Sequence, residues 1–459
     1  MTSTATTTAD SYAERVAALR DQLATLPPGA PVRLRKRSSN LFRPRAAVAT
    51  GLDVDAFAGV LAIDVAGRTA DVLGMTTYED LVAATLRHGL MPLVVPQLKT
   101  ITLGGAVTGL GVESSSFRSG CPHESVLAMD IITGDGRIVT ATPDGEHRAL
   151  FYGFPNSYGT LGYALRLRIE LEPVSAYVHL RHLSFPDTAA CTAAIAAIAA
   201  DGAYNGEPVA FLDGTVFSPT ECYLTLGSWA AAAPTTSDYT GQHIYYRSIQ
   251  QRSEDWLAVA DYLWRWDTDW FWCSRTFGAQ HPVVRRLWPR RWRRSDVYWK
   301  IVALERRYGL MRRVDAARGK PAQELVIQDV EVPVGRLPEF LEFLDEQTGI
   351  RPVWLCPMKQ RDPGATWPLY AFEPSTLYVN VGFWSAADLP AGEGDGWHNR
   401  AIEEAVARLG GRKSLYSTAF YPREEFWAAY GGPAYSSLKQ TYDPQGRLLD
   451  LYSKTVLRG

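Results

Sequence analysis

The sequence lacks a segment expected to enter or cross a membrane. Its first 26 residues contain no basic stretch followed by an apolar run, so no secretory signal is predicted. The most apolar helical run, AACTAAIAAIAA at 189–200, is shorter than the ~20 residues that span a bilayer. We expect this run to form a buried or half-buried helix of a cytoplasmic protein.

Cysteine and histidine patterns are also sparse. The five cysteines are scattered, odd in number and without a C-x-x-C pair, so we expect neither a disulfide framework nor a zinc site. This pattern favours a protein of the reducing cytoplasm. No H-E-x-x-H motif occurs among the eight histidines, so we expect no catalytic metal. The formal net charge of -2 removes any global electrostatic case for binding nucleic acid.

The length predicts more than one domain. A chain of 459 residues exceeds the size at which a single core keeps growing. The patterning changes after about Pro173, and we place the boundary there, with a first domain at 1–175 and a second at 176–459. The second domain carries an insertion at about 241–320, rich in Trp and Arg.

The first 175 residues predict a mixture of strands and helices. Gly134-Asp135-Gly136 between two apolar runs is a strong hairpin signal, and Thr76-x-x-Glu79 has the pattern of a helix capping box. The expected elements are a helix at 11–25, a hairpin at 60–65 and 70–73, a helix from Thr76 ended by Gly89, a strand at 93–95, a hairpin at 125–133 and 137–141, and a strand at 164–171.

The second part predicts an antiparallel sheet flanked by helices. Its alternating segments give a β-α-β-β-α order, which resembles half of a ferredoxin-like sheet. The segments are ELVIQDVEV at 324–332, LPEFLEFLDEQ at 337–347, PVWLC at 352–356, TLYVNVGFW at 376–384 and NRAIEEAVARLG at 399–410.

The stretch TLGGAVTGLGVESSS at 102–116 carries the most informative chemistry. Its glycines let the backbone approach a ligand and present N–H groups to a pyrophosphate, and Ser114 to Ser116 add hydroxyls. It is neither a G-x-G-x-x-G motif opening a helix nor a P-loop, so a Rossmann domain is disfavoured. We expect this stretch to form a loop, and a glycine-rich loop alone is more often a turn than a cofactor site. A second cluster, NSYGTLGY at 156–163, strengthens the cofactor interpretation.

These motifs together resemble a known family. GGAVTGLGVESSS, the Gly-Asp-Gly hairpin, HRALFYGFPNSYGTLGY and LRLRIELEP are similar to the PCMH-type FAD-binding domain of the vanillyl-alcohol oxidase superfamily. ESSS, PVWLCP and YPREEFW resemble the delta(24)-sterol reductases. The closest likeness, carried by VRLRKRSSNLFR, TYEDLVAATL, VVPQLKTITLGGAVTGLG, FPNSYGTLGY and WRWDTDWFWCSR, is to the actinobacterial 10-methylene fatty acid (tuberculostearic acid) reductases.

The resemblance implies an α+β fold, with a two-subdomain FAD-binding domain and a substrate-binding cap domain. RKRSSN at 35–40 lacks the glycine and histidine that link flavin covalently in many relatives, so noncovalent FAD is implied. Cys121 is expected to be a packing residue. The implied FAD contacts are Thr102, Leu103, Gly104, Gly105, Ala106, Val107, Thr108, Gly109, Leu110, Gly111, Val112, Glu113, Ser114, Ser115, Ser116, Gly159, Thr160, Leu161 and Gly162, with Ser38, Ser39 and Asn40 as phosphate contacts.

The implied reaction is reduction of an isolated carbon–carbon double bond by NADPH through FAD. The favoured substrate is the 10-methylene group of a phospholipid-bound fatty acyl chain. Three alternatives stay open: a sterol delta(24) reductase, an FAD-dependent alcohol or sugar oxidase or dehydrogenase, and a lipid-binding protein that presents substrate to a methyltransferase. An isolated alkene needs an acid near the ring. Glu113 is the first candidate acid, with Tyr158 and His123 behind it, although bracing roles are open for Glu113 and His123.

The segment at 261–294 combines tryptophans with arginines. Trp264, Trp266, Trp270 and Trp272 fit either core packing or the lining of an apolar passage. Aromatic residues beside cations are typical of a membrane interface, and we expect peripheral contact with the inner face of the cell membrane. RNA binding lacks a supporting fold. The arginines expected to make the membrane contact are Arg285, Arg286, Arg290, Arg291, Arg293 and Arg294.

Overall fold

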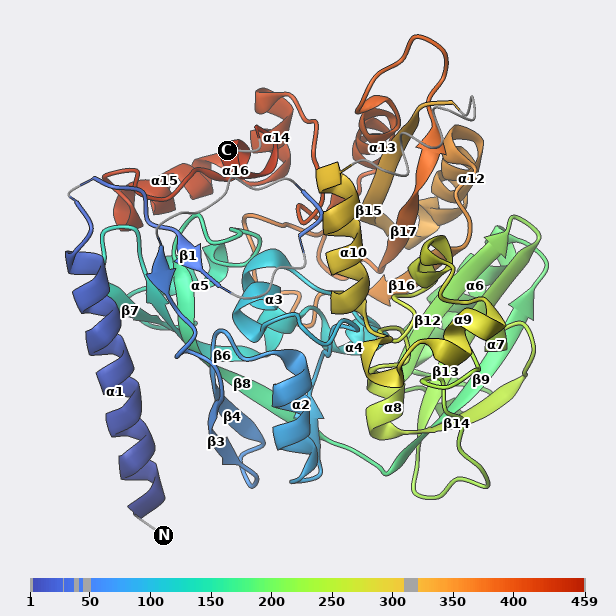
Figure 1. Cartoon of the computed structure of the whole chain (residues 1–459), viewed down its shortest axis with the longest axis horizontal. Helices are drawn as coiled ribbons and strands as arrows, with labels where there is room; N and C mark the ends of the chain where they lie inside the picture. Colours follow the sequence, from blue (N-terminus) through green and yellow to red (C-terminus); the bar gives the residue numbers. More distant parts are fainter. Residues whose placement is uncertain (1–2, 28, 37–40, 44–50, 309–320, 458–459) are drawn as a thin grey trace.

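Two large β-sheets organise the chain. The computed structural model describes residues 3–27, 29–36, 41–43, 51–308 and 321–457. A six-stranded sheet is built from the N-terminal part, and an eight-stranded antiparallel sheet is built from the part that follows it (Figure 1). The expected mixed α+β architecture with a large antiparallel sheet is therefore confirmed.

The first sheet contains both predicted hairpins. Its strands run in the spatial order β3 (Val60–Asp64), β4 (Thr69–Leu73), β8 (Tyr163–Pro173), β6 (Val126–Ile132), β7 (Ile138–Ala141), and β5 (Leu90–Pro92) also pairs with β8. The helices of this part are α1 (Ser3–Ala24), α2 (Tyr78–Leu86), α3 (Leu103–Gly109), α4 (Ser116–Ser119), η1 (Pro122–Ser125) and α5 (Arg148–Gly153), and a two-stranded sheet pairs β1 (Leu34–Arg35) with β2 (Leu52–Asp53).

Three predicted boundaries in this part are wrong. Helix α1 begins at Ser3 rather than Ser11, and the strand expected at 93–95 is β5 at 90–92. Helix α2 is capped by Thr77, whose side chain accepts a hydrogen bond from the Asp80 N–H. Thr76 does not cap the helix because its hydroxyl is buried and donates to the Leu73 carbonyl instead.

The second sheet has eight strands, and the β-α-β-β-α order expected between 324 and 410 is present. The strands lie in the order β14 (Glu254–Ala258), β9 (Tyr177–Phe185), β13 (Glu221–Ala230), β12 (Phe211–Ser218), β16 (Val353–Met358), β17 (Tyr378–Asp388), β15 (Gln323–Pro333), β18 (Arg412–Lys413). Helices α6 (Thr188–Asp201), α12 (Leu337–Thr348) and α13 (Trp397–Arg408) pack against it. The apolar run at 189–200 is accordingly a half-buried helix, as predicted.

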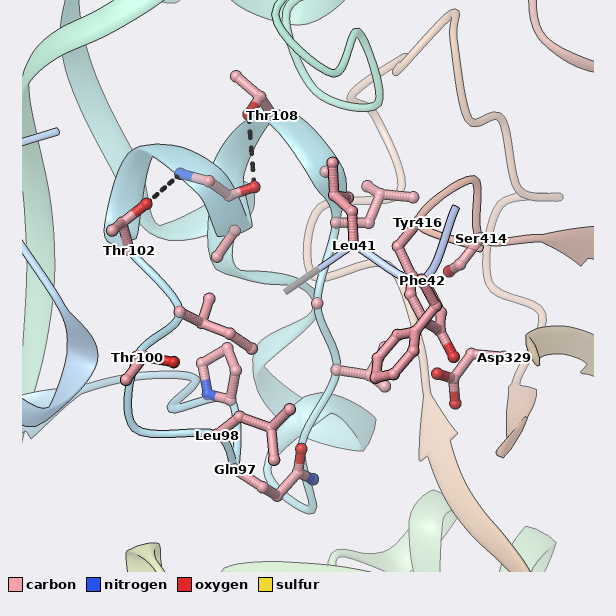
Figure 2. Close-up of a pocket in the computed structure, with 18 of the residues that line it drawn as sticks. Leu41, Phe42, Gln97, Leu98, Thr100, Thr102, Thr108, Asp329, Ser414 and Tyr416 are labelled. Carbon is pink, nitrogen blue, oxygen red and sulfur yellow. Dashed lines mark hydrogen bonds between the residues drawn. The ribbon is translucent and has the colours of Figure 1, made fainter. Parts of the chain in front are cut away.

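The alternation of β15 decides which side chains reach the site. Val326, Val330 and Val332 join the apolar cluster formed with α12 and α13. Because successive strand residues point to opposite faces, Asp329 and Glu331 point to the other side. This side of the sheet faces the glycine-rich segment of the first domain, as Figure 2 shows for Asp329.

The Trp/Arg insertion and the C-terminus connect the two sheets. The insertion contains α7 (Tyr245–Ser248), α8 (Val259–Leu263), η2 (Cys273–Phe277), α9 (Pro282–Leu287), η3 (Arg290–Trp292) and α10 (Ser295–Tyr308). The C-terminal helices α14 (Arg423–Ala429), α15 (Gly432–Tyr442) and α16 (Leu451–Thr455) return to the first sheet (Figure 1). Lys439 Nζ there donates to the Thr160 carbonyl at 2.8 Å. The predicted domain boundary after residue 175 stays a prediction. The contact of Lys439 with Thr160 also shows that the C-terminal segment packs against the N-terminal part of the chain.

Candidate functional site

A cavity of about 230 Å³ lies between α3 and the eight-stranded sheet. Figure 2 shows Thr102 and Thr108 of α3 on one side, and Asp329, Ser414 and Tyr416 on the other. The volume lies below the 300–1,000 Å³ typical of pockets that bury a whole drug-sized ligand. A dinucleotide occupying this cavity therefore extends beyond it.

The glycine-rich wall of the cavity is a helix rather than the expected loop. The Thr102 side chain caps α3 by accepting from the Gly105 N–H, and the Thr108 hydroxyl lies 3.3 Å from the Gly105 carbonyl oxygen, as Figure 2 shows. The Thr108 hydroxyl also donates to the Gly104 carbonyl at 2.7 Å. The N–H groups of Leu103, Gly104 and Ala106 also have acceptors, in Thr76, Gly74 and Thr102. The first turn of α3 therefore has no spare N–H group for a pyrophosphate.

The glycines of this wall permit close packing. A Cβ on Gly104 would lie 2.7 Å from the Gly74 carbonyl oxygen, and one on Gly109 would lie 3.1 Å from the Tyr158 ring. Of the FAD contacts implied by the sequence, the structure brings the following to the cavity: Thr102, Gly105, Ala106, Thr108, Gly109, Leu110, Gly111 and Val112.

The other implied contacts lie elsewhere. Leu103, Gly104 and Val107 are buried on the far side of α3, and Glu113 to Ser116 follow it away from the cavity lining. Gly159, Thr160, Leu161 and Gly162 are also absent from the lining, and a Cβ on Gly162 would meet the Ile132 carbonyl oxygen at 2.6 Å. Ser38, Ser39 and Asn40 lie outside the described residues. Contacts of all these residues with FAD stay predictions.

Strained backbone concentrates at this cavity. Eight described residues other than glycine have a positive φ, and four of them line it: Leu110, Tyr158, Trp270 and Phe271. Positive φ is unfavourable for bulky side chains and persists where the surroundings enforce it. Trp270 and Phe271 adopt it consecutively, with φ of 47° and 60°. Such clustering is characteristic of functional sites.

Aromatic rings form most of the second wall. Phe42, Trp270, Phe271, Trp354 and Trp384 all line the cavity. The Phe42 ring stacks on the Trp270 ring with 5.5 Å between the ring centroids, and the Phe271 and Trp384 ring centroids lie 4.3 Å apart. The Trp-rich half of the 261–294 segment thus both packs in the core, through Trp266 and Trp272, and lines the cavity through Trp270 and Phe271.

A buried ion-pair cluster supports this aromatic wall. The Arg265 guanidinium lies 3.0 Å from Glu113 Oε1 and 3.1 Å from Asp213 Oδ2. The indole N–H groups of Trp266 and Trp354 also donate to Asp213 Oδ2. Burial raises the pKa of Glu113, although the Arg265 charge opposes this. Glu113 therefore joins the first domain to the Trp-rich segment, and its role as an acid stays a prediction.

The two weaker candidate acids differ in position. Tyr158 lines the cavity, donates to the Gly109 carbonyl at 2.7 Å, and has a pKa that burial raises above its ordinary value. His123 lies outside the lining and packs edge-on against Trp367 at 4.4 Å. Burial lowers its pKa to about 3, which favours a neutral imidazole at pH 7, and its role as an acid stays a prediction. Cys121 packs with Met358 and Tyr378, which fits the expected packing role.

Sequence reasoning missed two carboxyl groups on β15. Asp329 lines the cavity, and Glu331 is buried two residues further along. Burial raises the pKa of Asp329 to about 6 and that of Glu331 to about 8. The sequence signal for these two groups was a pair of acids at alternating positions in the apolar strand ELVIQDVEV. A charged side chain on a buried strand face is unfavourable unless it is paired or hydrogen-bonded, so such a pair indicates a functional role.

The cavity has unused polar atoms that fit a flavin ring. Among the described residues, Gln97 Nε2 and Asn380 Oδ1 are buried without a hydrogen-bond partner, and both residues line the cavity. Buried polar groups ordinarily have partners. One donor and one acceptor, between a helix with glycines and a set of aromatic rings, suit a flat ring system that carries carbonyl and N–H groups. The residues present therefore fit FAD.

Comparisons with known proteins support the same cofactor. Residues 5–142 match the family model of the FAD binding domain. The chain is 25% identical over 441 residues to a delta(24)-sterol reductase of Arabidopsis thaliana, covering 88% of this chain and 76% of the relative. It is 26% identical over 409 residues to the delta(24)-sterol reductase of Homo sapiens, covering 86% and 75%.

A third similarity covers only part of the chain. Cytokinin dehydrogenase 6 of Oryza sativa subsp. japonica is 35% identical over 122 residues, which is 27% of this chain and 23% of that protein. The delta(24)-sterol reductase similarity thus extends over most of the chain, whereas this third similarity covers little more than a quarter of it.

Proposed function

We propose that this FAD-dependent oxidoreductase, a distant relative of the delta(24)-sterol reductases, reduces an isolated carbon–carbon double bond of a lipid with NADPH. The favoured substrate is the 10-methylene group of a phospholipid-bound fatty acyl chain, which becomes a 10-methyl group. The observation that carries the proposal is the cavity, which α3 lines together with seven aromatic side chains and a single carboxylic acid. An apolar wall suits a hydrocarbon chain, whereas a sugar would require several fixed hydrogen-bonding groups.

The protein's own residues bind, orient and exclude water. Gln97 and Asn380 offer a donor and an acceptor to the flavin, and the wall glycines let α3 approach it. Bound FAD supplies hydride transfer between the nicotinamide and the substrate. Phe42, Trp270 and Trp384 keep water from the reacting carbon and hold the chain against the ring.

Anaerobic half-reactions test the proposal. The purified protein is expected to be yellow, its flavin absorbance is expected to bleach with NADPH, and a 10-methylene phospholipid is expected to restore the absorbance and yield the 10-methyl product by mass spectrometry. Restoration by a Δ24 sterol but not by the phospholipid would replace the substrate with a sterol. Oxygen consumption with alditols and no bleaching by NADPH would indicate an oxidase. A colourless protein would indicate the lipid-presenting alternative.

We also propose that the protein docks on an anionic membrane. Transferring an acyl chain of about 16 methylenes into water would cost on the order of 13 kcal/mol at ~0.8 kcal/mol per methylene, so the chain must pass directly from bilayer to cavity. Among the described helices, none combines the length and apolar character needed to span a bilayer.

The docking surface has two parts. Val283, Val284, Leu287 and Trp292, on α9 and η3, are large apolar side chains exposed to solvent, with Leu287 at 77%. Arg286 and Arg291 beside them are also exposed. Val283 and Leu287 stand one helical turn apart and share a face of α9. Exposed apolar groups beside cations suit the boundary between lipid headgroups and acyl chains.

Four of the six arginines expected at the membrane have partners within the protein. Arg285 is 1% exposed and bonded to Asp269, and Arg293 is 7% exposed and donates to backbone carbonyls, including that of Trp288. Arg290 pairs with Asp238, and Arg294 pairs with Glu79 and Asp296. These four arginines hold the insertion together, which leaves Arg286 and Arg291 for lipid.

Liposome sedimentation tests the docking. Binding to vesicles of phosphatidylcholine and phosphatidylglycerol is expected to weaken at least roughly thirtyfold in the Arg286→Glu/Arg291→Glu variant, at about 1 kcal/mol per arginine. The matched control, Arg20→Glu/Arg87→Glu, changes the net charge equally on exposed positions of α1 and at the end of α2. Equal loss in both variants, or no loss in either, would remove the proposed surface.

A further inference from the structure

Asp329 occupies a position made for a carboxyl group. It lies in the middle of β15, directly opposite Gly382 on β17. A Cβ on Gly382 would lie 2.6 Å from Asp329 Oδ1, so any larger residue at 382 would displace the carboxyl group. Because residue 382 is glycine, the Asp329 carboxyl group has room beside the Trp384 ring.

Neutral hydrogen-bond donors surround this carboxyl group. Asn380 Nδ2 donates to Asp329 Oδ1 at 3.0 Å, and Asn380 is fully buried. The pKa of Asp329 is raised to about 6 by burial and lowered in part by hydrogen bonds from Asn380, Tyr416 and Trp384, all of them uncharged. Asp329 thus faces the cavity next to Asn380 Oδ1, a buried acceptor that lacks a partner among the described residues.

The other acidic groups at the cavity are weaker donors. Burial raises the pKa values of Tyr158 and Tyr416 above the ordinary tyrosine value of about 10. A carboxylic acid with a pKa of about 6 is therefore a stronger acid than either phenol by at least about four pKa units. A general acid acts best when its pKa lies near the working pH.

We propose that Asp329 is the proton donor of the alkene reduction, because its carboxyl group faces α3 across the cavity that would hold flavin and substrate. This inference rests on the proposed function. The O–H bond of Asp329 breaks and the π electrons of the alkene form a C–H bond with the released proton. Bound flavin, once reduced by NADPH, would supply a hydride with its electron pair to the other alkene carbon. The proton that restores the Asp329 carboxyl group would come from the solvent as H⁺, which balances the overall reaction.

Glu331 assists as a positioning residue. Its carboxyl group accepts from the Tyr370 hydroxyl and, at 3.3 Å, from the Ser414 hydroxyl, and Ser414 itself lines the cavity. Burial raises the pKa of Glu331 to about 8, so Glu331 is protonated at neutral pH. When Asp329 loses its proton, the resulting carboxylate does not face a second negative charge on the same strand.

The first test measures the two half-reactions of the holoenzyme with Asp329→Asn. The flavin is reduced with NADPH or, independently of any nicotinamide, with dithionite, and is then mixed anaerobically with the 10-methylene phospholipid. FAD content and flavin reduction are expected to match wild type, whereas reoxidation by the lipid is expected to slow by at least about a hundredfold. Reoxidation within threefold of wild type would overturn the assignment. Asp329→Glu, which keeps a carboxyl group, is expected to recover part of the rate.

A matched control lies on the same strand. Glu324 is buried on the opposite face of β15, where it accepts from the Gly396 and His398 N–H groups. Glu324→Gln is expected to leave reoxidation unchanged, so an equal loss in both variants would make the Asp329 effect structural. If chemically reduced wild type is not reoxidised by any lipid alkene, the proposed function fails, and the donor role fails with it.

The second test needs no turnover. Infrared spectra of the holoenzyme between pH 4 and pH 8 are expected to contain a protonated-carboxyl band that titrates near pH 6 and is missing from Asp329→Asn but present in Glu324→Gln. Glu331 on the same strand and Tyr416 interact electrostatically with Asp329, and the other titratable groups at the cavity are Tyr158 and Lys36, which line it, and Arg43 above the Tyr158 ring. Spectra of wild type and Asp329→Asn that coincide would overturn the assignment even if activity were lost.

Discussion

The Arg265 cluster and the β15 pair each bury two carboxyl groups, but their surroundings differ. In the first, the Arg265 guanidinium bridges Glu113 and Asp213, and two indole N–H groups complete the cluster. In the second, the groups that contact Asp329 and Glu331 are amide, indole, hydroxyl and phenol donors. A nearby cation favours the ionised form of a buried carboxyl group and opposes the rise of its pKa. Burial beside neutral donors leaves more of that rise, so the pKa of the carboxyl group moves closer to neutral pH.

This difference indicates a structural role for the Arg265 cluster and a role in proton transfer for the β15 pair. The Arg265 cluster joins the segment after α8 to Glu113 and to Asp213 on β12, and it contacts Trp354, whose ring lines the cavity. The β15 pair lies on the cavity side of the sheet. A proton donor must release and regain its proton, which a charge held by an arginine does poorly. The comparison therefore favours β15 for the acid and the Arg265 cluster for rigidity.

The largest effect is expected when the cluster loses its cation. Arg265→Met leaves Glu113 and Asp213 buried together without a positive charge, and removing one partner of a buried pair costs about 3–5 kcal/mol. Urea unfolding at pH 7 measures the loss. Arg336→Met, which breaks an exposed pair with Glu339, is the control and is expected to cost less than about 1 kcal/mol. Similar losses in the two variants would mean that the cluster does not brace the fold.

A smaller effect, visible in its pH dependence, is expected from the β15 pair. Glu331 has a folded-state pKa of about 8, and its unfolded value is about 4.3. The native protein therefore keeps a proton that the unfolded chain releases, so this contribution to stability is complete below pH 4.3 and is lost as the pH rises through 8. The slope is about 1.4 kcal/mol per pH unit.

Glu331→Gln removes this slope. Between pH 5.5 and pH 7.5, the difference in free energy of unfolding between wild type and the variant is expected to change by about 3 kcal/mol, in favour of the variant at the higher pH. The titratable groups near Glu331 are Asp329, Tyr370, Tyr430, Tyr158 and Cys121. A difference that does not vary with pH in chemical denaturation would show that Glu331 ionises normally.

The smallest effect is expected for Glu113→Gln. A glutamine keeps the size of the Glu113 side chain and an oxygen that can accept from Arg265 and Ser114, while Arg265 keeps Asp213 as its ion-pair partner. The variant is expected to lose less than about 1 kcal/mol of stability and to be reoxidised by lipid within threefold of wild type. A hundredfold loss of reoxidation with full FAD content would instead restore Glu113 as the acid.

Local patterns predicted much of the fold. The two hairpins of the first sheet and the order from β15 to α13 follow from turn residues and from alternation, which act over a few positions. The glycine-rich stretch was misjudged because its glycines resemble a loop. Its helical form depends on Thr102 and Thr108, which hydrogen-bond the first turns, and on the close approach to Gly74 that Gly104 permits.

The site was predicted less completely, because its residues come from distant parts of the chain. Thr102, Gly105, Ala106 and Thr108 to Val112, which line the cavity, could be named from sequence because they belong to one continuous motif, although Leu103, Gly104 and Val107 of the same motif do not line it. Asp329 was missed. Its alternation with Glu331 indicates a buried acid, but nothing near it in the chain indicates that β15 turns this face toward α3. Similarly, PRRWRR suggests a uniform basic surface, but backbone carbonyls and acids from other segments enclose or pair Arg290, Arg293 and Arg294.

The types of element and the glycine-rich motif could be predicted from the amino-acid sequence, because propensity, periodicity and short motifs act between neighbours in the chain. The pairing of a buried carboxyl group with a cation, the exposure of each arginine and the position of each tryptophan at the cavity depend on tertiary contacts. Burial and charge pairing depend on residues that are hundreds of positions apart, such as Glu113 and Arg265. The free energy of a buried charge is set by these neighbours in space.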